Sequence, residues 1–182
     1  MATQSAIAQH TWTIDPGHSE ASFAVKHLMI STVKGNFRNV SGTIVLDESN
    51  PAASHVEAEI DAASIDTRQE QRDTHLRSPD FFDVEKYPAL TFRSTRVEAV
   101  GGGRFRVLGD LTIRDVTKPV VLDVEETGRG KDPWGGERVG YSATTKFDRT
   151  DFGLTWNQAL ETGGIMVGNE VKVTLDVQAV LA

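Results

Sequence analysis

The segment RDTHLRSPDFF, residues 72–82, gathers the side chains that general acid–base chemistry uses. Arg72, Asp73 and His75 could hold an anionic group and transfer a proton if they converged on one substrate. On a helix, however, Arg72 shares a face with His75, and Asp73 shares one with Arg77. Because Asp73 and Arg77 make a favourable ion pair, we favour a structural salt bridge or cap over catalysis at this segment.

No other group of residues has the spacing of a catalytic or metal site. The chain has no cysteine, which excludes disulfides and thiolate chemistry. His18 and His27 are an odd number of residues apart, which places them on opposite faces of a regular strand, and no H-E-x-x-H spacing occurs. No G-x-S-x-G surrounds a serine. We therefore predict no catalytic residue, no metal site and no required cofactor.

Period-two alternation of apolar and polar residues predicts that most of the chain is β-strand. The alternation is plainest at 171–181, and it recurs at 21–25, 56–60, 105–113, 120–124 and 141–147. Turn-forming glycine, proline, asparagine and aspartate residues separate these segments. About eight antiparallel strands with almost no helix predict an all-β fold, either a closed up-and-down barrel or a two-sheet sandwich.

One segment, residues 66–76, departs from this pattern. It contains good helix formers after a capable N-cap in Asp66 or Thr67. Leu76 is its only large apolar side chain, so an apolar stripe cannot anchor the helix. We expect charge pairs to hold it, and Phe81–Phe82 to plug an apolar opening.

Length and composition predict one domain over residues 11–182, preceded by a disordered stretch at 1–10. The net charge is −7, and the acidic residues are spread along the chain. This charge argues against binding to nucleic acid or to an anionic membrane surface. Neither a secretory signal nor a transmembrane stretch is visible, which predicts a cytoplasmic protein, or a periplasmic one if a leader has been removed.

The segment FDRTDFGLTWN, residues 147–157, places Arg149 among Phe147, Phe152 and Trp156. Aromatic residues usually pack in a core before they mark a ligand site. If the predicted barrel is hollow, the same side chains form the wall of its cavity. The segment therefore predicts either a packed core or a pocket.

Four blocks, in this order, resemble the YceI-like family of lipocalin-like, polyisoprenoid-binding proteins. They are WTIDPGHSEASFAVKHLMISTVKGNF at 12–37, IDTRQEQRDTHLRSPDFFDVEKYPALTFRST at 65–95, LGDLTIRDVTKPVVLDV at 108–124, and DRTDFGLTWN followed by GGIMVGNEVKVTLDV. The resemblance implies an eight-stranded antiparallel barrel with an elongated apolar interior and a short helix near its mouth. It also implies a long isoprenoid or related lipid inside the barrel and, commonly, a homodimer.

Our leading hypothesis is therefore non-enzymatic binding, transport or storage of a long apolar chain, of the polyprenyl quinone or polyprenyl phosphate type. A fatty acid or fatty amide is the near alternative. The expected tail contacts are Phe23, Val25, Phe37, Phe92, Leu111, Ile113, Phe147, Phe152 and Trp156. The expected lid residues are Phe81 and Phe82, and the candidate head-group residues are His27, Arg72, Asp73, Arg149 and Asn157.

Two hypotheses from other classes remain open. The first is a barrel enzyme that acts on a lipid head group with His27 or His75 together with Asp73. The second is a filled barrel that serves as an interaction module through an exposed apolar edge. An interior closed by large side chains would favour the second hypothesis, and a continuous tunnel would count against it.

Overall fold

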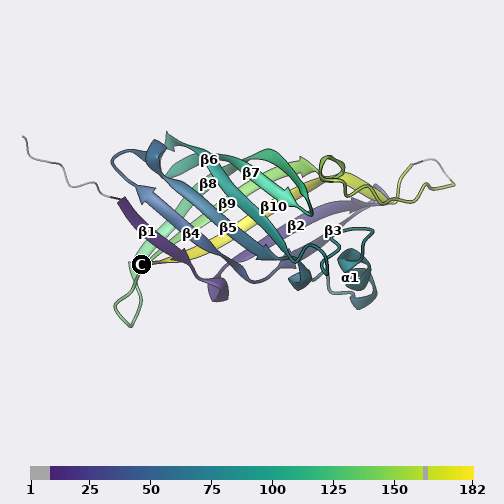
Figure 1. Cartoon of the computed structure of the whole chain (residues 1–182), viewed down its shortest axis with the longest axis horizontal. Coiled ribbons are helices and arrows are strands. Elements are labelled where there is room, and N and C mark those ends of the chain that lie inside the picture. The colour runs from purple at the N-terminus through teal and green to yellow at the C-terminus, as the bar shows by residue number, and fades with distance from the viewer. Residues whose placement is uncertain (1–8, 162–163) are drawn as a thin grey trace, which may run out of the picture.

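The computed structural model describes residues 9–161 and 164–182, and most of them lie in one antiparallel sheet (Figure 1). The strands are β1 (Gln9–Ile14), β2 (Glu20–His27), β3 (Ser31–Phe37), β4 (Val40–Asp47), β5 (His55–Asp61), β6 (Ala89–Gly101), β7 (Arg104–Ile113), β8 (Val116–Lys131), β9 (Glu137–Asp148) and β10 (Val167–Leu181). The helices are α1 (Glu70–Arg77) and the short 3₁₀ turns η1 (Pro16–His18), η2 (Pro51–Ala53), η3 (Ala62–Ser64) and η4 (Arg149–Phe152). β1 begins at Gln9, two residues before the predicted domain start, and the rest of the predicted N-terminal tail lies outside the described residues.

The sheet closes into an eight-stranded barrel because β1 pairs with both β4 and β10. The ring runs β1-β4-β5-β6-β7-β8-β9-β10 and returns to β1. β2 and β3 continue the sheet beyond this ring. Residues 179–181 of β10 pair with β1, whereas residues 167–176 of β10 pair with β2. The predicted barrel is confirmed, and the two-sheet alternative is wrong.

Alternation sets which side chains face inward, as on β10. There Lys172, Thr174 and Asp176 are exposed, while the residues between them are partly buried. Where β1, β9 and β10 meet, large side chains fill the barrel: Trp12, Ile14, Val139 and Ala179 are at most 3% exposed. This packed end lies near the C-terminus, whereas α1 lies beside the barrel toward the other end (Figure 1).

α1 begins at Glu70, four residues later than the predicted start at Asp66. The backbone of Asp66 instead pairs with Asn36 of β3 through two hydrogen bonds of 2.9 Å. Arg68 then takes a positive φ of 64°, which a helix does not allow. The residue before α1 is Gln69, whose side chain makes no capping hydrogen bond, so neither predicted N-cap holds. Within the described residues, no helix has the length and apolar character needed to cross a bilayer.

A charged cluster links the start of η1 to β9 and β10. The Arg138 guanidinium donates to Asp15 Oδ2 at 2.8 Å, to Asp132 Oδ2 at 2.9 Å and to Gln178 Oε1 at 3.0 Å. His18 Nδ1 also lies 2.8 Å from Asp15 Oδ2. Hydrogen bonds from Arg138 and then from His18 lower the pKa of Asp15 from 3.8 to about 2. The cluster therefore holds the connection between β1 and β2 against β9 and β10.

Asp15→Asn is expected to lower the free energy of unfolding at neutral pH by about 1 kcal/mol, since the pair is partly solvated. The Asp15 pKa is lower in the folded than in the unfolded chain. The carboxylate therefore stabilises the fold fully above about pH 4, and this contribution is lost as the pH falls towards 2. Urea unfolding of both proteins across this range measures the difference. Asp176→Asn, at an exposed position of β10, is the control. A difference that grows as the pH falls would contradict the prediction.

Candidate ligand-binding cavity

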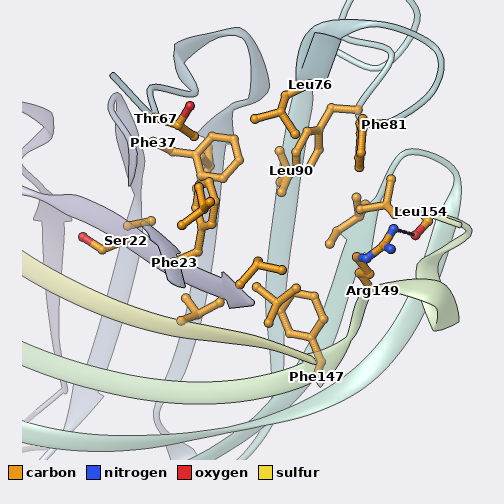
Figure 2. A pocket seen from close by; sticks show the side chains of 18 of the residues that line it. Ser22, Phe23, Phe37, Thr67, Leu76, Phe81, Leu90, Phe147, Arg149 and Leu154 are labelled. Carbon is orange, nitrogen blue, oxygen red and sulfur yellow. Dashed lines mark hydrogen bonds between the residues drawn. The ribbon is translucent and has the colours of Figure 1, made fainter. Parts of the chain in front are cut away.

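An apolar cavity of about 690 Å³ occupies the interior of the barrel. The structure places thirteen of the sixteen predicted site residues on its wall, and Figure 2 shows several of them. These thirteen are Phe23, Val25, His27, Phe37, Arg72, Phe81, Phe82, Phe92, Leu111, Ile113, Phe147, Arg149 and Trp156. The cavity has the size of small-molecule sites in other proteins. A packed interior is therefore wrong for this part of the barrel, while contact of these residues with a ligand stays a prediction.

The cavity wall includes many residues that the sequence analysis did not single out. Most are apolar strand residues: Val33, Val40, Ala58, Ile60, Leu90, Val120, Leu122, Val171, Val173, Leu175 and Val177. Each of the segments 56–60, 120–124 and 171–181 was predicted to bury this face. The alternation was therefore sufficient to find the eight residues in these segments, but not Val33, Val40 and Leu90, and the emphasis on aromatic residues passed over the aliphatic ones.

Aromatic side chains close one side of the cavity beneath α1. The Phe82 ring packs edge-on against Phe37 at 5.5 Å, and Phe37 lies 5.6 Å from Phe23 of β2. Phe81 is 6% exposed and lies 5.5 Å from the ring of Trp156. The residues after α1 thus cover the apolar interior, in the place that the sequence predicted for a plug.

Arg149, in η4, is the most deeply buried cation on the cavity wall, with 3% exposure. Its Nε donates to the Gly168 carbonyl at 2.8 Å, and Nη1 donates to the Leu154 carbonyl at 2.5 Å (Figure 2). A longer contact of 3.4 Å joins Nη2 to the Val167 carbonyl. Burial lowers the pKa of Arg149 from its usual value, an effect that the nearby Asp148 partly opposes. Arg149 therefore joins the two ends of the segment between β9 and β10.

The predicted ion pair between Asp73 and Arg77 is wrong. Asp73 is 3% exposed and accepts hydrogen bonds from the backbone N–H (2.9 Å) and the hydroxyl of Thr67. Arg77 instead donates to the carbonyls of Ala63 and Ile65, both at 3.1 Å. Because Thr67 lies six residues before Asp73, helical spacing could not indicate this partner. Asp73 is absent from the cavity wall, so its prediction as a head-group residue is also wrong.

Arg72 reaches the cavity wall while it is tied to the same threonine. Its Nε donates to Thr67 Oγ1 at 2.7 Å, and its Nη2 donates to the Thr67 carbonyl at 2.7 Å. The Thr67 hydroxyl in turn donates to Asp73. Thr67 thus connects the cation on the wall with a buried carboxylate behind it.

Two further predicted contacts lie off the cavity wall. Phe152 is 1% exposed and packs behind the wall, with its ring 5.1 Å from that of Phe147. Asn157 donates from Nδ2 to the Val167 carbonyl at 2.8 Å, and its Oδ1 accepts from the Val167 N–H at 3.0 Å. The η4 turn follows β9 and ends its alternation, so the sequence does not indicate which way these two side chains point.

His75 and Asp73, two of the residues proposed for head-group catalysis, form hydrogen bonds with other residues. His75 lines the cavity, and its Nε2 lies 2.8 Å from Asp80 Oδ2, where both side chains are partly exposed. The His75 ring also packs edge-on against Trp156, with ring centres 4.6 Å apart. Asp73 thus bonds Thr67 and His75 bonds Asp80 rather than each other, and the catalytic alternative stays a prediction.

Comparisons with known proteins agree with this geometry. The family model described as YceI-like domain matches residues 12–179. A UPF0312 protein of Vibrio cholerae is 44% identical over 137 residues, which cover 75% of this chain and 72% of the relative.

Two solved structures share the fold. BcnA of Burkholderia cenocepacia matches with a TM-score of 0.79 at 23% identity, over 91% of this chain and 98% of its own. A polyisoprenoid binding domain from Saccharophagus degradans, implicated in plant cell wall breakdown, matches with a TM-score of 0.67 at 15% identity. The match covers 94% of this chain and 98% of that domain. At these identities, the two likenesses support the fold alone.

Proposed function

The chain belongs to the YceI-like family, and from this premise we propose that its barrel binds the long apolar tail of a polyisoprenoid-type lipid without transforming it. The cavity in the barrel carries the proposal. Five β10 residues line it: Val167, Val171, Val173, Leu175 and Val177. The ten residue steps from Val167 to Val177 correspond to roughly 33 Å along a strand. A wall of this length suits an extended chain better than a compact ligand.

Burial of the tail supplies the binding free energy. Each methylene group removed from water contributes about 0.8 kcal/mol before the costs of ordering and immobilising the ligand are subtracted. A tail of several isoprene units therefore binds tightly without any head-group contact. The resemblance to the YceI-like family, which implies a polyisoprenoid, favours the polyprenyl quinone or polyprenyl phosphate class over a fatty acid or fatty amide.

Transport or storage follows from binding without chemistry. The side chains around the cavity offer apolar surface and fixed cations, and the histidine and aspartate that would form a dyad bind other partners. The homodimer that the family resemblance implies, and the cytoplasmic location predicted from the sequence, stay predictions.

Organic extraction of the natively purified protein is expected to release a long-chain isoprenoid in near-stoichiometric amount. Mass spectrometry of the extract, beside an extract from a mock purification, identifies the tail and its head group. The lipid should be absent from the mock sample. A clean extract, from protein that also fails to bind added polyprenyl quinone and polyprenyl phosphate, would refute the proposed function.

A further inference from the structure

We propose that the lipid bound in the barrel carries an anionic head group, a phosphate or a carboxylate, and that Arg149 holds it. This inference rests on the proposed function, because it names the head group of the same ligand. Among isoprenoids it favours polyprenyl phosphates over quinones and alcohols, and among the fatty alternatives it favours an acid over an amide.

The charges on the cavity wall favour an anion. The chain has 26 acidic and 19 basic residues, yet none of the described residues that line the cavity is aspartate or glutamate. Lys26, Arg72 and Arg149 all line it. Lys26 is exposed on β2, whereas Arg149 is buried, so the charged side chains on the wall are all cationic, and they attract anions and repel cations.

Arg149 is a buried cation whose neighbours neutralise little of its charge. In the described part of the chain, the acceptors that it contacts are three backbone carbonyls. The closest carboxylate in sequence, Asp148, forms no ion pair with Arg149 among the described residues, and its Oδ1 accepts from the N–H and hydroxyl of Thr150 at 2.8 and 2.6 Å. By contrast, the more exposed Arg138 binds two carboxylates. Burial of a cation without a counter-ion is unfavourable, and an anionic ligand would offset this cost.

The guanidinium of Arg149 also has N–H groups that can donate further hydrogen bonds. A guanidinium has five N–H groups, and three carbonyls leave two of them without an acceptor. Arginine binds phosphate and carboxylate oxygens with strong, charge-assisted hydrogen bonds. A quinone or alcohol oxygen could accept one of these bonds, but it would leave the positive charge uncompensated.

Ligand pairs that differ only in the charge of the head group test this inference. Geranylgeranyl phosphate is compared with geranylgeraniol, and oleate with oleamide, on protein stripped of lipid over a hydrophobic resin. Binding is followed by calorimetry. We expect the wild-type protein to prefer the anion in at least one pair by roughly tenfold to hundredfold. The two pairs distinguish a phosphate from a carboxylate, and inorganic phosphate as competitor shows whether the head group binds without its tail.

Variants of Arg149 then locate the effect. Arg149→Gln is expected to remove most of the preference for the anion and to leave the affinity for the neutral partner nearly unchanged, whereas Arg149→Lys retains part of it. Arg106→Gln removes the same charge from an exposed position of β7 and should behave as the wild type. The neutral ligand reports whether each variant still forms the cavity. If Arg149→Gln does not fold, the inference is tested by the preference of the wild-type protein for the anion and by its reduction in Arg149→Lys.

Equal affinity of the wild-type protein for charged and neutral partners would overturn the inference and leave the proposed function intact. The same holds if Arg149→Gln keeps the full preference for the anion. Arg149 would then serve only to stabilise the segment between β9 and β10. Failure of the wild-type protein to bind any of the four lipids would overturn the proposed function itself.

Discussion

Replacing Val173 with tryptophan is expected to abolish binding of long isoprenoid chains while short chains still bind. Val173 lines the cavity near the middle of β10, where it pairs with Phe23 of β2 and Thr145 of β9. An indole at this position would block the tunnel. Because each excluded methylene group forfeits about 0.8 kcal/mol, the affinity for a chain of eight isoprene units should fall by roughly a hundredfold or more.

A second substitution tests whether the position of the blocking side chain sets the longest isoprenoid chain that binds. Val177 lies four residues further along the same face of β10, roughly 13 Å from Val173 along the strand. Val177→Trp should therefore admit longer chains than Val173→Trp, provided that the head group lies at the Arg149 end. Competition binding with polyprenyl phosphates of two to eight isoprene units measures the longest chain that each variant accepts.

The control for this series is Val121→Trp, which makes the same change at a position of β8 that is 36% exposed. It should bind every chain as the wild type does. An equal loss of affinity for short and long chains in Val173→Trp would contradict the tunnel, because it would indicate a general disruption of the barrel. If Val177→Trp accepts only shorter chains than Val173→Trp does, the lipid lies in the opposite direction.

The barrel and most of its cavity wall could be predicted because one physical rule governs both. In a closed sheet, the inward residues of every strand face the same interior, so the alternation of β10 or β7 indicates both the fold and the wall. Phe23, Leu111 and Ile113 were found in this way. The rule does not say whether the interior is full or hollow. That depends on the barrel as a whole, which Trp12 and its neighbours fill only at one end.

The errors fall where backbone geometry interrupts a regular period. Phe152 ends η4 and Asn157 follows it, so their orientation no longer continues that of β9. Asp66 forms a bridge to β3 rather than the first turn of a helix, and this pairing is invisible to local helix propensity. Asp73 accepts hydrogen bonds from Thr67 instead of pairing with Arg77, because the loop before α1 brings the threonine to it. Each error involves a contact that sequence spacing alone does not encode.

Gly42→Ala is expected to be among the most destabilising small substitutions in the barrel. Gly42 lies in β4 with a φ of 144°, a conformation that residues with a side chain rarely adopt. An added Cβ would lie only 2.1 Å from the Glu57 carbonyl oxygen and 2.8 Å from the Ala58 Cα on the paired strand β5. These are backbone atoms, which cannot rotate away as a side chain does. Backbone strain and overpacking each cost about 1–3 kcal/mol, so the free energy of unfolding should fall by roughly 3 kcal/mol or more.

The matched control for Gly42→Ala is Gly128→Ala, in β8. Gly128 has no positive φ, and an added Cβ there would meet no atom within 4 Å. Its free energy of unfolding should change by no more than about 0.5 kcal/mol. Urea unfolding of both variants measures the two effects under the same conditions. Similar stabilities would mean that β4 and β5 separate at Gly42 to admit the methyl group. Because Ala58 lines the cavity beside Gly42, that separation should also change the affinity for the lipid, whereas Gly128→Ala should leave it unchanged.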